Sequence, residues 1–459
     1  MKTASVVICG AGIAGISAAF HLAVKRGVKE VLLVDELAPL TLTSDKSTEA
    51  YRNWWPGPGN TMVRFMNHSI DLLEELASES DNYFSMNRRG YVFLTADPDH
   101  VPVIERSAIE ISQLGAGPLR YHRGLSNDPP YSPSASRGFG PQLTGADLVL
   151  DQALIRKHYP FISERAVAML HTRRCGWLSA QQLGMYLLEQ AKEHGVKFLK
   201  GRVIDVTVRK EQIETVHVNS DGEPIRISTR HFVIAAGPLL KQVGAMIGID
   251  LPVFNELHGK IAFKDSLGVV PRDAPLMIWN DPTILPWTDE ERKVLAASKE
   301  TQWLLEAFPG GVHFRPEGGA GSQTLLALWT YDIKVQKLVW PPSFPPEYAE
   351  VVMRGMSVMI PALSVYLGKT GKPVVDGGYY CKTQENRPLI GPLPVKGAYV
   401  IGALSGFGIM ASMAAGDLVA LHVAGEELPD YAPAFLLSRY EVPDYQSLLA
   451  NWDATSGQL

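Results

Sequence analysis

The sequence has few cysteines, no long apolar run and no block of like charge, and each absence excludes a class of protein. Only 3 of its 459 residues are cysteine, and their wide, irregular spacing argues against zinc sites and disulfide scaffolds and for a reducing compartment, the cytoplasm. No run of 18 or more apolar residues occurs, so we expect no transmembrane segment. The short apolar run at 6–8 meets glycines at once, unlike a secretory signal.

Charge of one sign is also scarce. The formal net charge is −5, and no Lys/Arg-rich run could follow a phosphate backbone, so we expect no nucleic-acid partner. Hydrophobic residues make up 46% and charged residues 20%, which is ordinary for a globular protein. A chain of this length folds as two or three domains. An enzyme with a small-molecule substrate fits these numbers best.

The first 35 residues form a β-α-β pattern. Residues 6–9 are a continuous run typical of a buried parallel strand, and 31–34 are a second. Between them lie three glycines at 10, 12 and 15 and an apolar helical segment over 13–25. Asp35 ends the second strand. This crossover length is the one that a parallel sheet requires.

The three glycines have distinct physical tasks in such a turn. Gly10 permits the tight bend, Gly12 allows the backbone to approach a pyrophosphate, and Gly15 allows the helix to pack closely on the strand. The free amides and the positive end of the helix dipole then meet the phosphates. Asp35 can accept hydrogen bonds from a ribose diol. The pattern therefore predicts dinucleotide binding.

Two later features favour FAD over a nicotinamide cofactor. A strand ending in Ala235-Ala236-Gly237 and a turn at Gly406-Phe407-Gly408, which opens a helix over 409–424, can bring the chain back over the isoalloxazine end. Ordinary strand-turn packing is the alternative interpretation. The polar, aromatic and Pro/Gly-rich stretch at 41–60 is a functional candidate loop, since a simple nicotinamide domain would continue with a helix there.

Residues 245–375 are rich in short strands, aromatics and prolines and indicate a second domain. Thr288 and Glu291 have capping-box spacing and predict a helix over 291–297, followed by a second over 301–307. This insertion is either a lid or a peripheral hairpin, and we favour the hairpin.

Over nearly its whole length the sequence resembles the D-amino-acid oxidase superfamily, in particular the branch of sarcosine oxidase, glycine oxidase and related amine dehydrogenases. Besides the glycine turn, the resemblance rests on five motifs, of which the last two in that order are the most specific. They are Gly176-Trp177-Leu178, Ala235-Ala236-Gly237, Phe314-Arg315-Pro316, Thr383-Gln384-Glu385-Asn386-Arg387-Pro388-Leu389-Ile390-Gly391 and Ser405-Gly406-Phe407-Gly408.

The resemblance implies an α/β fold with a Rossmann-like FAD-binding domain assembled from separated segments, and an α+β substrate domain with an antiparallel sheet. We assign 1–85, 150–240 and 376–459 to the first and 86–149 and 241–375 to the second. The implied reaction is hydride transfer from a C–H bond next to nitrogen to flavin N5, which gives an imine that water hydrolyses. No metal is implied.

The implied FAD-binding residues come from both ends of the chain. FAD is expected to be noncovalent, because the cysteine that carries covalent flavin in the family falls at Gly378 here, and not at Cys381. The expected contacts are Gly10, Gly12, Ile13, Ala14, Gly15, Asp35, Glu36, Ser44, Lys46, Ser47, Thr48, Val203, Ala235, Ala236, Gly237, Gly406, Phe407, Gly408, Ile409 and Met410.

The candidate catalytic residues are Arg52, Glu49, His258 and Tyr380. Arg52 matches the arginine that holds a substrate carboxylate in sarcosine oxidase, a task that suits its planar fork. A purely structural ion pair is the alternative.

Three positions depart from that relative. Glu49 replaces an arginine above the flavin, Met410 replaces a second carboxylate-binding lysine, and Leu326 stands where an oxygen-activating lysine lies. These departures leave open both the size of the amine and whether O2 or another redox partner accepts the electrons. Aromatic residues expected near the flavin would suit a larger or N-substituted amine, although most of them are expected in the core. They are Trp54, Trp55, Tyr379, Tyr380, Phe407 and Trp329.

Two other functions remain open at this point. Oxidation of a 2-hydroxy acid or another alcohol would need a general base near the flavin, for which His258 is a candidate. A flavoprotein with an assembly or binding role is the third possibility.

Overall fold

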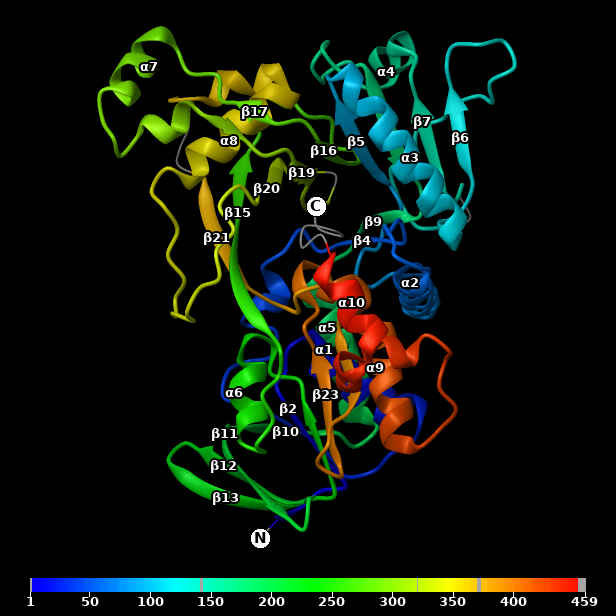
Figure 1. The fold of residues 1–459 in the computed structure, drawn as a ribbon, viewed down its shortest axis with the longest axis vertical. Coiled ribbons are helices and arrows are strands. Elements are labelled where there is room, and N and C mark those ends of the chain that lie inside the picture. Colours follow the sequence, from blue (N-terminus) through cyan, green and yellow to red (C-terminus); the bar gives the residue numbers. More distant parts are fainter. Residues whose placement is uncertain (1, 141–142, 320, 370–372, 453–459) are drawn as a thin grey trace.

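The computed structural model describes residues 2–140, 143–319, 321–369 and 373–452. Figure 1 shows two lobes along the long axis of the molecule, with a parallel sheet in the lower lobe and a large antiparallel sheet in the upper one. Strands β15 and β21 run between the lobes. The chain passes from one lobe to the other several times, as expected for domains assembled from separated segments.

The lower lobe is built on a six-stranded sheet, in which five strands are parallel and the edge strand β22 is antiparallel. The order is β10 (Lys197–Lys200), β3 (Val31–Asp35), β2 (Val6–Cys9), β14 (His231–Ile234), β23 (Ala398–Gly402) and β22 (Leu389–Pro392). Both strands of the first β-α-β unit therefore lie inside the sheet and are parallel, as the sequence predicts.

Four helices pack around this sheet and on one another: α1 (Ile13–Phe20, continued by a π turn over His21–Lys25), α2 (Thr61–Glu79), α5 (Ala180–Glu193) and α9 (Gly408–Ala424). Helices α1 and α9 cross so closely that a Cβ on Gly416 would lie 2.2 Å from the Ser17 Oγ atom. The Ser17 hydroxyl donates to the Ser412 carbonyl at 2.7 Å across this crossing.

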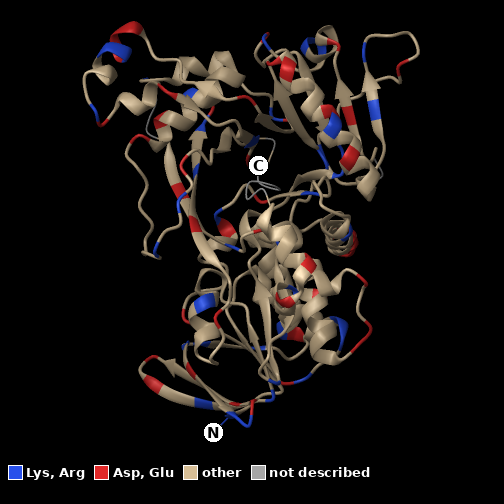
Figure 2. Cartoon of the chain, in the orientation of Figure 1, with Lys and Arg blue, Asp and Glu red and all other residues tan. Residues whose placement is uncertain are grey.

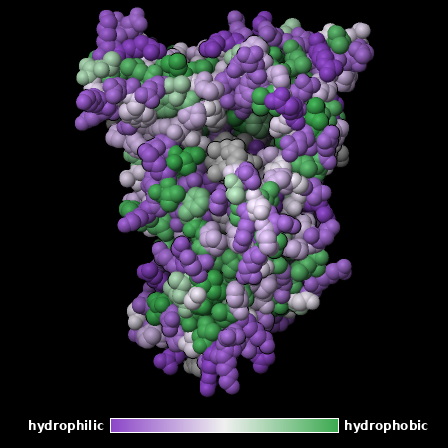
Figure 3. Space-filling model, in the orientation of Figure 1, coloured by the Kyte–Doolittle hydropathy of each residue, from purple (hydrophilic) through white to green (hydrophobic). Residues whose placement is uncertain are grey.

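Among the described residues, one helical stretch, Ser405–Ala424, is long and apolar enough to cross a membrane, and 67% of it is buried inside the fold. Its contacts with α1 and α2 make it a core helix. On the face shown in Figure 3, hydrophobic residues lie in small groups among hydrophilic ones. Acidic and basic residues are interspersed along the chain in both lobes (Figure 2). This arrangement gives no support for a membrane-spanning role.

A second sheet of four strands extends the lower lobe, in the order β1 (Lys2–Thr3), β13 (Glu223–Ser228), β12 (Gln212–Ser220) and β11 (Arg202–Arg209). Strand β11 directly follows β10 of the six-stranded sheet and contains Val203.

The upper lobe is built on a nine-stranded sheet that is antiparallel except for the pairs β16–β5 and β6–β7. This confirms the fold class expected from the sequence. The strands, in order, are β21 (Val374–Lys382), β15 (Phe254–Lys264), β20 (Thr324–Leu328), β19 (Val312–Pro316), β16 (Leu276–Trp279), β5 (Tyr91–Thr95), β8 (Ala168–Thr172), β7 (Ala146–Val149) and β6 (Leu119–His122). Helices α3 (Val101–Ile111), α4 (Gln152–His158) and α8 (Tyr348–Met359) belong to this lobe.

Two strands of the upper sheet cross the boundaries of our domain assignment. Strand β8 and most of β21 pair in the nine-stranded sheet, although 150–240 and 376–459 were assigned to the FAD-binding domain. Hydrogen bonding across the sheet places these strands in the upper lobe. The division into two domains itself stays a prediction.

The insertion at 288–307 is only half as predicted. Helix α7 (Asp289–Ala296) begins with the expected capping box, in which the Thr288 hydroxyl and the Glu291 carboxylate exchange hydrogen bonds with backbone amides. The expected helix over 301–307 is wrong, because that stretch forms a 3-10 turn (Gln302–Leu305) and a short strand, β18 (Ala307–Phe308), that pairs with β17 (Thr283–Ile284).

Candidate active site

The turn between β2 and α1 leaves no room for a side chain at Gly10 or at Gly15. A Cβ on Gly10, whose φ is +113°, would lie 2.4 Å from the Ala235 carbonyl oxygen, and one on Gly15 would lie 1.9 Å from the Gly10 carbonyl oxygen. The turn, the first turn of α1 and the end of β14 are therefore in direct backbone contact. This close approach is the physical requirement that the sequence pattern predicts.

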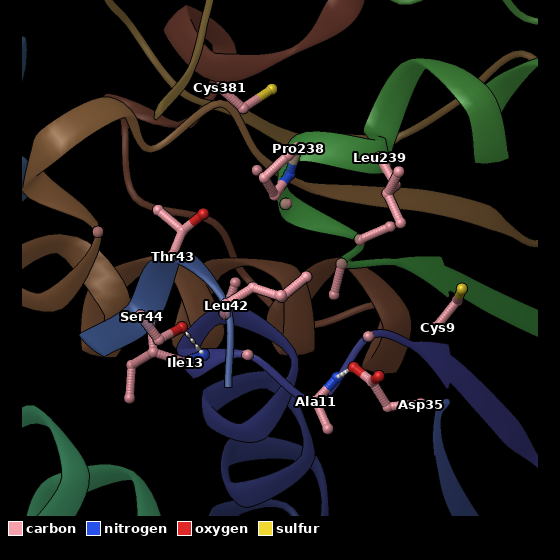
Figure 4. A pocket seen from close by; sticks show the side chains of 18 of the residues that line it. Cys9, Ala11, Ile13, Asp35, Leu42, Thr43, Ser44, Pro238, Leu239 and Cys381 are labelled. Atoms are coloured by element: carbon pink, nitrogen blue, oxygen red, sulfur yellow. Dashed lines mark hydrogen bonds between the residues drawn. The ribbon is translucent and has the colours of Figure 1, made fainter. Parts of the chain in front are cut away.

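Asp35 organises the same turn from the end of β3. Its Oδ2 atom accepts a hydrogen bond from the Ala11 amide at 2.7 Å, and Oδ1 accepts one from the Leu37 amide at 2.9 Å. On the other side, the Ser44 hydroxyl accepts a hydrogen bond from the Ile13 amide at 2.9 Å. Figure 4 shows the Ala11–Asp35 and Ile13–Ser44 hydrogen bonds along one wall of a cavity, with Pro238 and Leu239 opposite.

Most of the expected FAD contacts line this first cavity. Three others, Thr48, Phe407 and Met410, line the second cavity described below. Those that line the first are Gly10, Gly12, Ile13, Ala14, Asp35, Glu36, Ser44, Ser47, Val203, Ala235, Ala236, Gly237, Gly406, Gly408 and Ile409.

Two expected contacts lie behind the cavity wall. Gly15 lies beneath the turn, against Gly10. The Lys46 ammonium donates to Asp376 Oδ2 at 2.8 Å, which holds its charged end on β21. Lys46 thus contributes to fastening its loop.

The first cavity has the form and polarity that FAD needs. Asp35, Glu36 and the start of α1 line this cavity, and they would hold a ribose diol and the pyrophosphate of FAD. The wall formed by Pro238, Leu239 and Met246 was not predicted. Its only signal in the sequence is the Gly237-Pro238 step after β14. The residues present therefore fit FAD.

A second cavity opens from the first. They share Ser47, Tyr380, Ser405 and Gly406. A Cβ on Gly406 would lie 2.7 Å from Tyr380 Cε2, so glycine is required for the Tyr380 ring to lie at this junction. The remaining lining residues of the second cavity are Thr48, Arg52, Trp55, His258, His313, Leu328, Thr330, Asn386, Phe407 and Met410.

Arg52 lies in the wall of this second cavity at the end of β4 (Ala50–Arg52), which pairs with β9 (Cys175–Trp177). Its guanidinium carbon is 4.8 Å from the Trp55 ring centre, and Trp55 meets Phe407 edge-on at 5.0 Å. Burial lowers the Arg52 pKa, but a guanidinium keeps its charge in proteins. The residue therefore presents a cation within an aromatic wall.

The aromatic residues named from the sequence divide between cavity and core. Trp55, Tyr380 and Phe407 line the second cavity, and Tyr379 and Tyr380 line the first. Trp54 and Trp329 are core residues. Four of the six therefore line a cavity, which is more than the sequence predicts, since most of them were expected in the core.

His258 lines the second cavity from β15. Its ring stacks on Tyr380 with centres 4.1 Å apart and planes 16° apart, and Nε2 donates to Glu256 Oε2 at 3.1 Å. His313, on β19, lines the same cavity and was not predicted. Its Nδ1 atom donates to the Gly311 carbonyl at 2.9 Å. Only the pairing of β15, β20 and β19 brings the two histidines together.

Glu49 lies outside both cavities, which corrects the expectation that it stands above the flavin. The backbone at Glu49 has a φ of +56°, and its carboxylate turns to the start of α5, where Oε2 accepts from the Ala180 amide at 3.0 Å. The Arg315 guanidinium is 3.8 Å away. Burial raises the pKa of Glu49, and this effect outweighs the lowering caused by the positive charge of Arg315. Glu49 therefore caps a helix.

From the sequence, Leu326 is the aliphatic residue that replaces the oxygen-activating lysine. In the structure the residue that lines the second cavity is Leu328, two positions later. Leu326 pairs with Arg315, and Leu328 pairs with both Lys260 and His313. Strand register thus places Leu328 at the site.

Two buried cationic side chains of the upper sheet donate hydrogen bonds to backbone carbonyls of the 44–49 loop. The Lys260 ammonium donates to the Asp45 carbonyl at 2.7 Å, and the Arg315 guanidinium donates to the Thr48 carbonyl. The loop between the cavities is therefore fixed by both lobes. Neither contact has a signal in the local sequence.

Metal chemistry has no candidate centre in the part of the chain that the structure describes. No three histidine, cysteine, aspartate or glutamate side chains come together there in a way that could hold an ion. The three cysteines, Cys9, Cys175 and Cys381, are free and buried.

One curated relative shares part of this chain. Dimethylglycine dehydrogenase, mitochondrial, of Rattus norvegicus is 23% identical over 256 residues, which are 56% of this chain and 26% of the relative. The matched part thus spans about a quarter of that relative's length.

Solved structures share the whole fold. L-proline dehydrogenase from P. horikoshii superposes with a TM-score of 0.70 at 20% identity, covering 96% of this chain and 98% of that one. Glycine oxidase from Geobacillus kaustophilus superposes with a TM-score of 0.72 at 16% identity, covering 96% and 99%. The profile of the DAO family, described as FAD dependent oxidoreductase, matches residues 5–421. The first cavity fits FAD, and the family profile covers most of the chain. The chain therefore belongs to the DAO family of FAD-dependent oxidoreductases.

Proposed function

We propose that the protein uses FAD to oxidise an amine that carries a carboxylate, namely an amino acid, and in particular a bulky or N-substituted one. The observation that carries the proposal is the second cavity, which joins the FAD cradle at Tyr380 and contains the Arg52 guanidinium. Among its described lining residues none is an aspartate or glutamate. A cavity with one fixed cation favours a carboxylate over a simple cationic amine.

The protein's own residues would bind, orient and shield such a substrate. Arg52 would hold the carboxylate bidentately, while Trp55, Phe407 and Leu328 would pack on the rest of the molecule and exclude water. Bound FAD would accept the hydride from the C–H bond next to nitrogen, and water would hydrolyse the resulting imine. The aromatic walls support a substrate with an apolar part.

The names of similar structures agree with this substrate class. They include an iminodiacetate oxidase from Chelativorans sp. BNC1 and an L-amino acid deaminase from Proteus vulgaris. At 17% and 14% identity they share the fold, so the substrate of this chain rests on its own cavity.

The test is an anaerobic panel of substrates added to the yellow holoenzyme. We expect flavin absorbance near 450 nm to bleach with N-alkyl or bulky amino acids, and to bleach far less with the matching decarboxylated amines. Bleaching with the decarboxylated amines alone would contradict the proposal. Readmission of air then separates an oxidase, which regains colour, from a dehydrogenase that needs another redox partner.

Oxidation of a 2-hydroxy acid is the second candidate, and the hydrogen-bonded pair of His258 and Glu256 at the cavity favours it. A neutral imidazole can take the hydroxyl proton as hydride leaves. Bleaching by hydroxy acids and by none of the amines in the same panel would select this candidate. A protein that no compound in a broad panel bleaches would instead favour a binding role.

We also propose that FAD is bound noncovalently. Cys9 and Cys381 line the first cavity, and burial raises the pKa of each thiol to about 12, so both stay protonated and are poor nucleophiles. Precipitation with trichloroacetic acid is expected to leave the yellow colour in the supernatant. A yellow protein pellet would overturn the assignment.

Three free, buried cysteines support a cytoplasmic location as a further proposal. Fractionation of the source cells with antibody detection tests it, and recovery in a membrane or extracellular fraction would contradict it.

A further inference from the structure

The second cavity contains a histidine whose orientation is fixed on two sides. The His258 ring stacks on Tyr380, and its Nε2–H donates to Glu256 Oε2 at 3.1 Å. With that tautomer, Nδ1 is the ring atom left to accept a proton. Because His258 lines the cavity, a substrate there has an imidazole acceptor beside it.

Glu256 is held as an anion behind this imidazole. The Lys382 ammonium donates to the same carboxylate oxygen at 3.0 Å. Burial by itself would raise the Glu256 pKa, but the hydrogen bond from His258 and the charge of Lys382 outweigh it, so the pKa is lowered. A carboxylate behind an imidazole fixes its tautomer and stabilises the imidazolium form.

The other histidine of the cavity lacks this support. His313 donates from Nδ1 to a neutral carbonyl, that of Gly311, and burial lowers its pKa to about 4. Burial also lowers the His258 pKa, while Glu256 raises it, so His258 rests neutral and can still be protonated. The titratable and charged groups around His258 are Glu256, Lys382, Tyr380, His313 and Arg52.

We propose that His258, oriented by Glu256, accepts the proton from the substrate's ammonium nitrogen while Arg52 holds its carboxylate. The inference rests on the proposed function and deepens it, because it makes the substrate a zwitterion bound between a guanidinium and a neutral imidazole. A role in the reaction as a proton acceptor makes His258 a catalytic residue and Glu256 a positioning residue.

The proton transfer balances with no further reactant. An ammonium nitrogen has no lone pair to share with carbon as hydride leaves. The N–H bond breaks, its electron pair remains on nitrogen, and the proton forms a new bond to His258 Nδ1. The resulting imidazolium keeps its Nε2–H hydrogen bond to the Glu256 carboxylate, and it returns the proton to solvent after the product leaves.

The first test is the pH profile of the limiting rate of anaerobic flavin reduction, with an amino acid that bleaches the enzyme. The glutamine of His258→Gln keeps a hydrogen-bond donor for Glu256. In this variant the fall of the rate at low pH is expected to begin at a higher pH, near the pKa of the substrate amine. This falling part of the profile is called the acid limb. The rate near pH 7 should fall by about 10²–10⁴-fold and recover as pH rises. A merely structural defect would lower the rate at every pH.

Two further variants make the kinetic test specific. Glu256→Gln removes the carboxylate charge, so the acid limb is expected to move to lower pH with a slower plateau. His313→Gln alters the cavity's other imidazole and should leave the position of the acid limb unchanged. If the limb moves equally in His258→Gln and His313→Gln, the assignment to His258 is wrong.

The second test is an equilibrium measurement with 2-aminoisobutyrate, an amino acid with no hydrogen on the carbon next to nitrogen. Its dissociation constant, followed by calorimetry on the oxidised holoenzyme, should rise as His258 is protonated, by up to about tenfold per pH unit. The rise should be absent in His258→Gln and absent for isobutyrate, which lacks the amine.

The outcomes separate this inference from the function on which it rests. If no amine reduces the flavin, the proposed function fails and takes the inference with it. If amines do reduce the flavin but His258→Gln keeps the wild-type pH profiles of both rate and 2-aminoisobutyrate binding, only the role of His258 fails.

Discussion

Gly15→Ala is expected to yield a protein that retains about a tenth or less of the FAD of the wild type. The added Cβ would lie 1.9 Å from the Gly10 carbonyl oxygen and 3.2 Å from the Ala235 Cβ. Since the first obstacle is backbone, the turn itself must move, and overpacking of this kind costs about 1–3 kcal/mol, which is roughly 5–150-fold in affinity. The 450/280 nm absorbance ratio of the purified protein measures the loss.

Gly319→Ala is the control for Gly15→Ala. At Gly319 nothing lies within 4 Å, and Gly319→Ala should retain full flavin. Equal flavin content in Gly15→Ala and Gly319→Ala would show that FAD binding does not require the close packing of Gly15 against Gly10.

The glycine turn and its two flanking strands were predictable, because the residues that specify them are close together in the sequence. Strands 6–9 and 31–34 were predicted within one residue of β2 and β3, since continuous β-branched runs and a glycine turn specify both strand and crossover. The sequence also shows an amphipathic helical pattern over 67–78, with Ile70, Leu73 and Leu76 at helical spacing, but helix α2 begins six positions earlier, at Thr61. Its buried first turn, with Met62 and Val63, follows directly on a Pro/Gly-rich loop that dominates the local pattern.

The substrate side was less predictable because it depends on pairing between distant strands. Arg52 could be named from the sequence, because its position matches the carboxylate-binding arginine of the family that the sequence resembles. His313 and Leu328 reach the cavity only through the antiparallel register of β19 and β20. A shift of one residue in that register would turn both side chains away, and local sequence does not specify it.

Glu49 shows a second reason why site residues escape prediction. Its position in the chain is that of a residue above the flavin, but a backbone φ of +56° directs its side chain to the α5 amides. Free amides at a helix start bind a carboxylate favourably. The match to the family thus named Glu49 as a site residue, whereas its side chain lies outside both cavities.

Arg52→Lys is expected to raise KM for an amino-acid substrate by about 10–150-fold, because hydrogen bonds to charged groups contribute roughly 1.5–3 kcal/mol. Lysine keeps the charge but loses the planar fork that binds both carboxylate oxygens. It also loses the guanidinium stacking on Trp55, whose ring centre lies 4.8 Å from the Arg52 guanidinium carbon. Steady-state kinetics and the affinity for isobutyrate measure the effect.

The decarboxylated amine supplies the internal control for Arg52, because it keeps the reacting C–H and C–N bonds and lacks only the anion. If Arg52 anchors the carboxylate, Arg52→Lys should change the kinetics with this amine far less than with the amino acid, while flavin content stays at the wild-type value. An equal loss with both substrates would mean that Arg52 shapes the cavity wall with Trp55 and binds no carboxylate. If the affinities for the amino acid and for the decarboxylated amine are both unchanged while flavin stays bound, Arg52 does not bind the substrate's carboxylate.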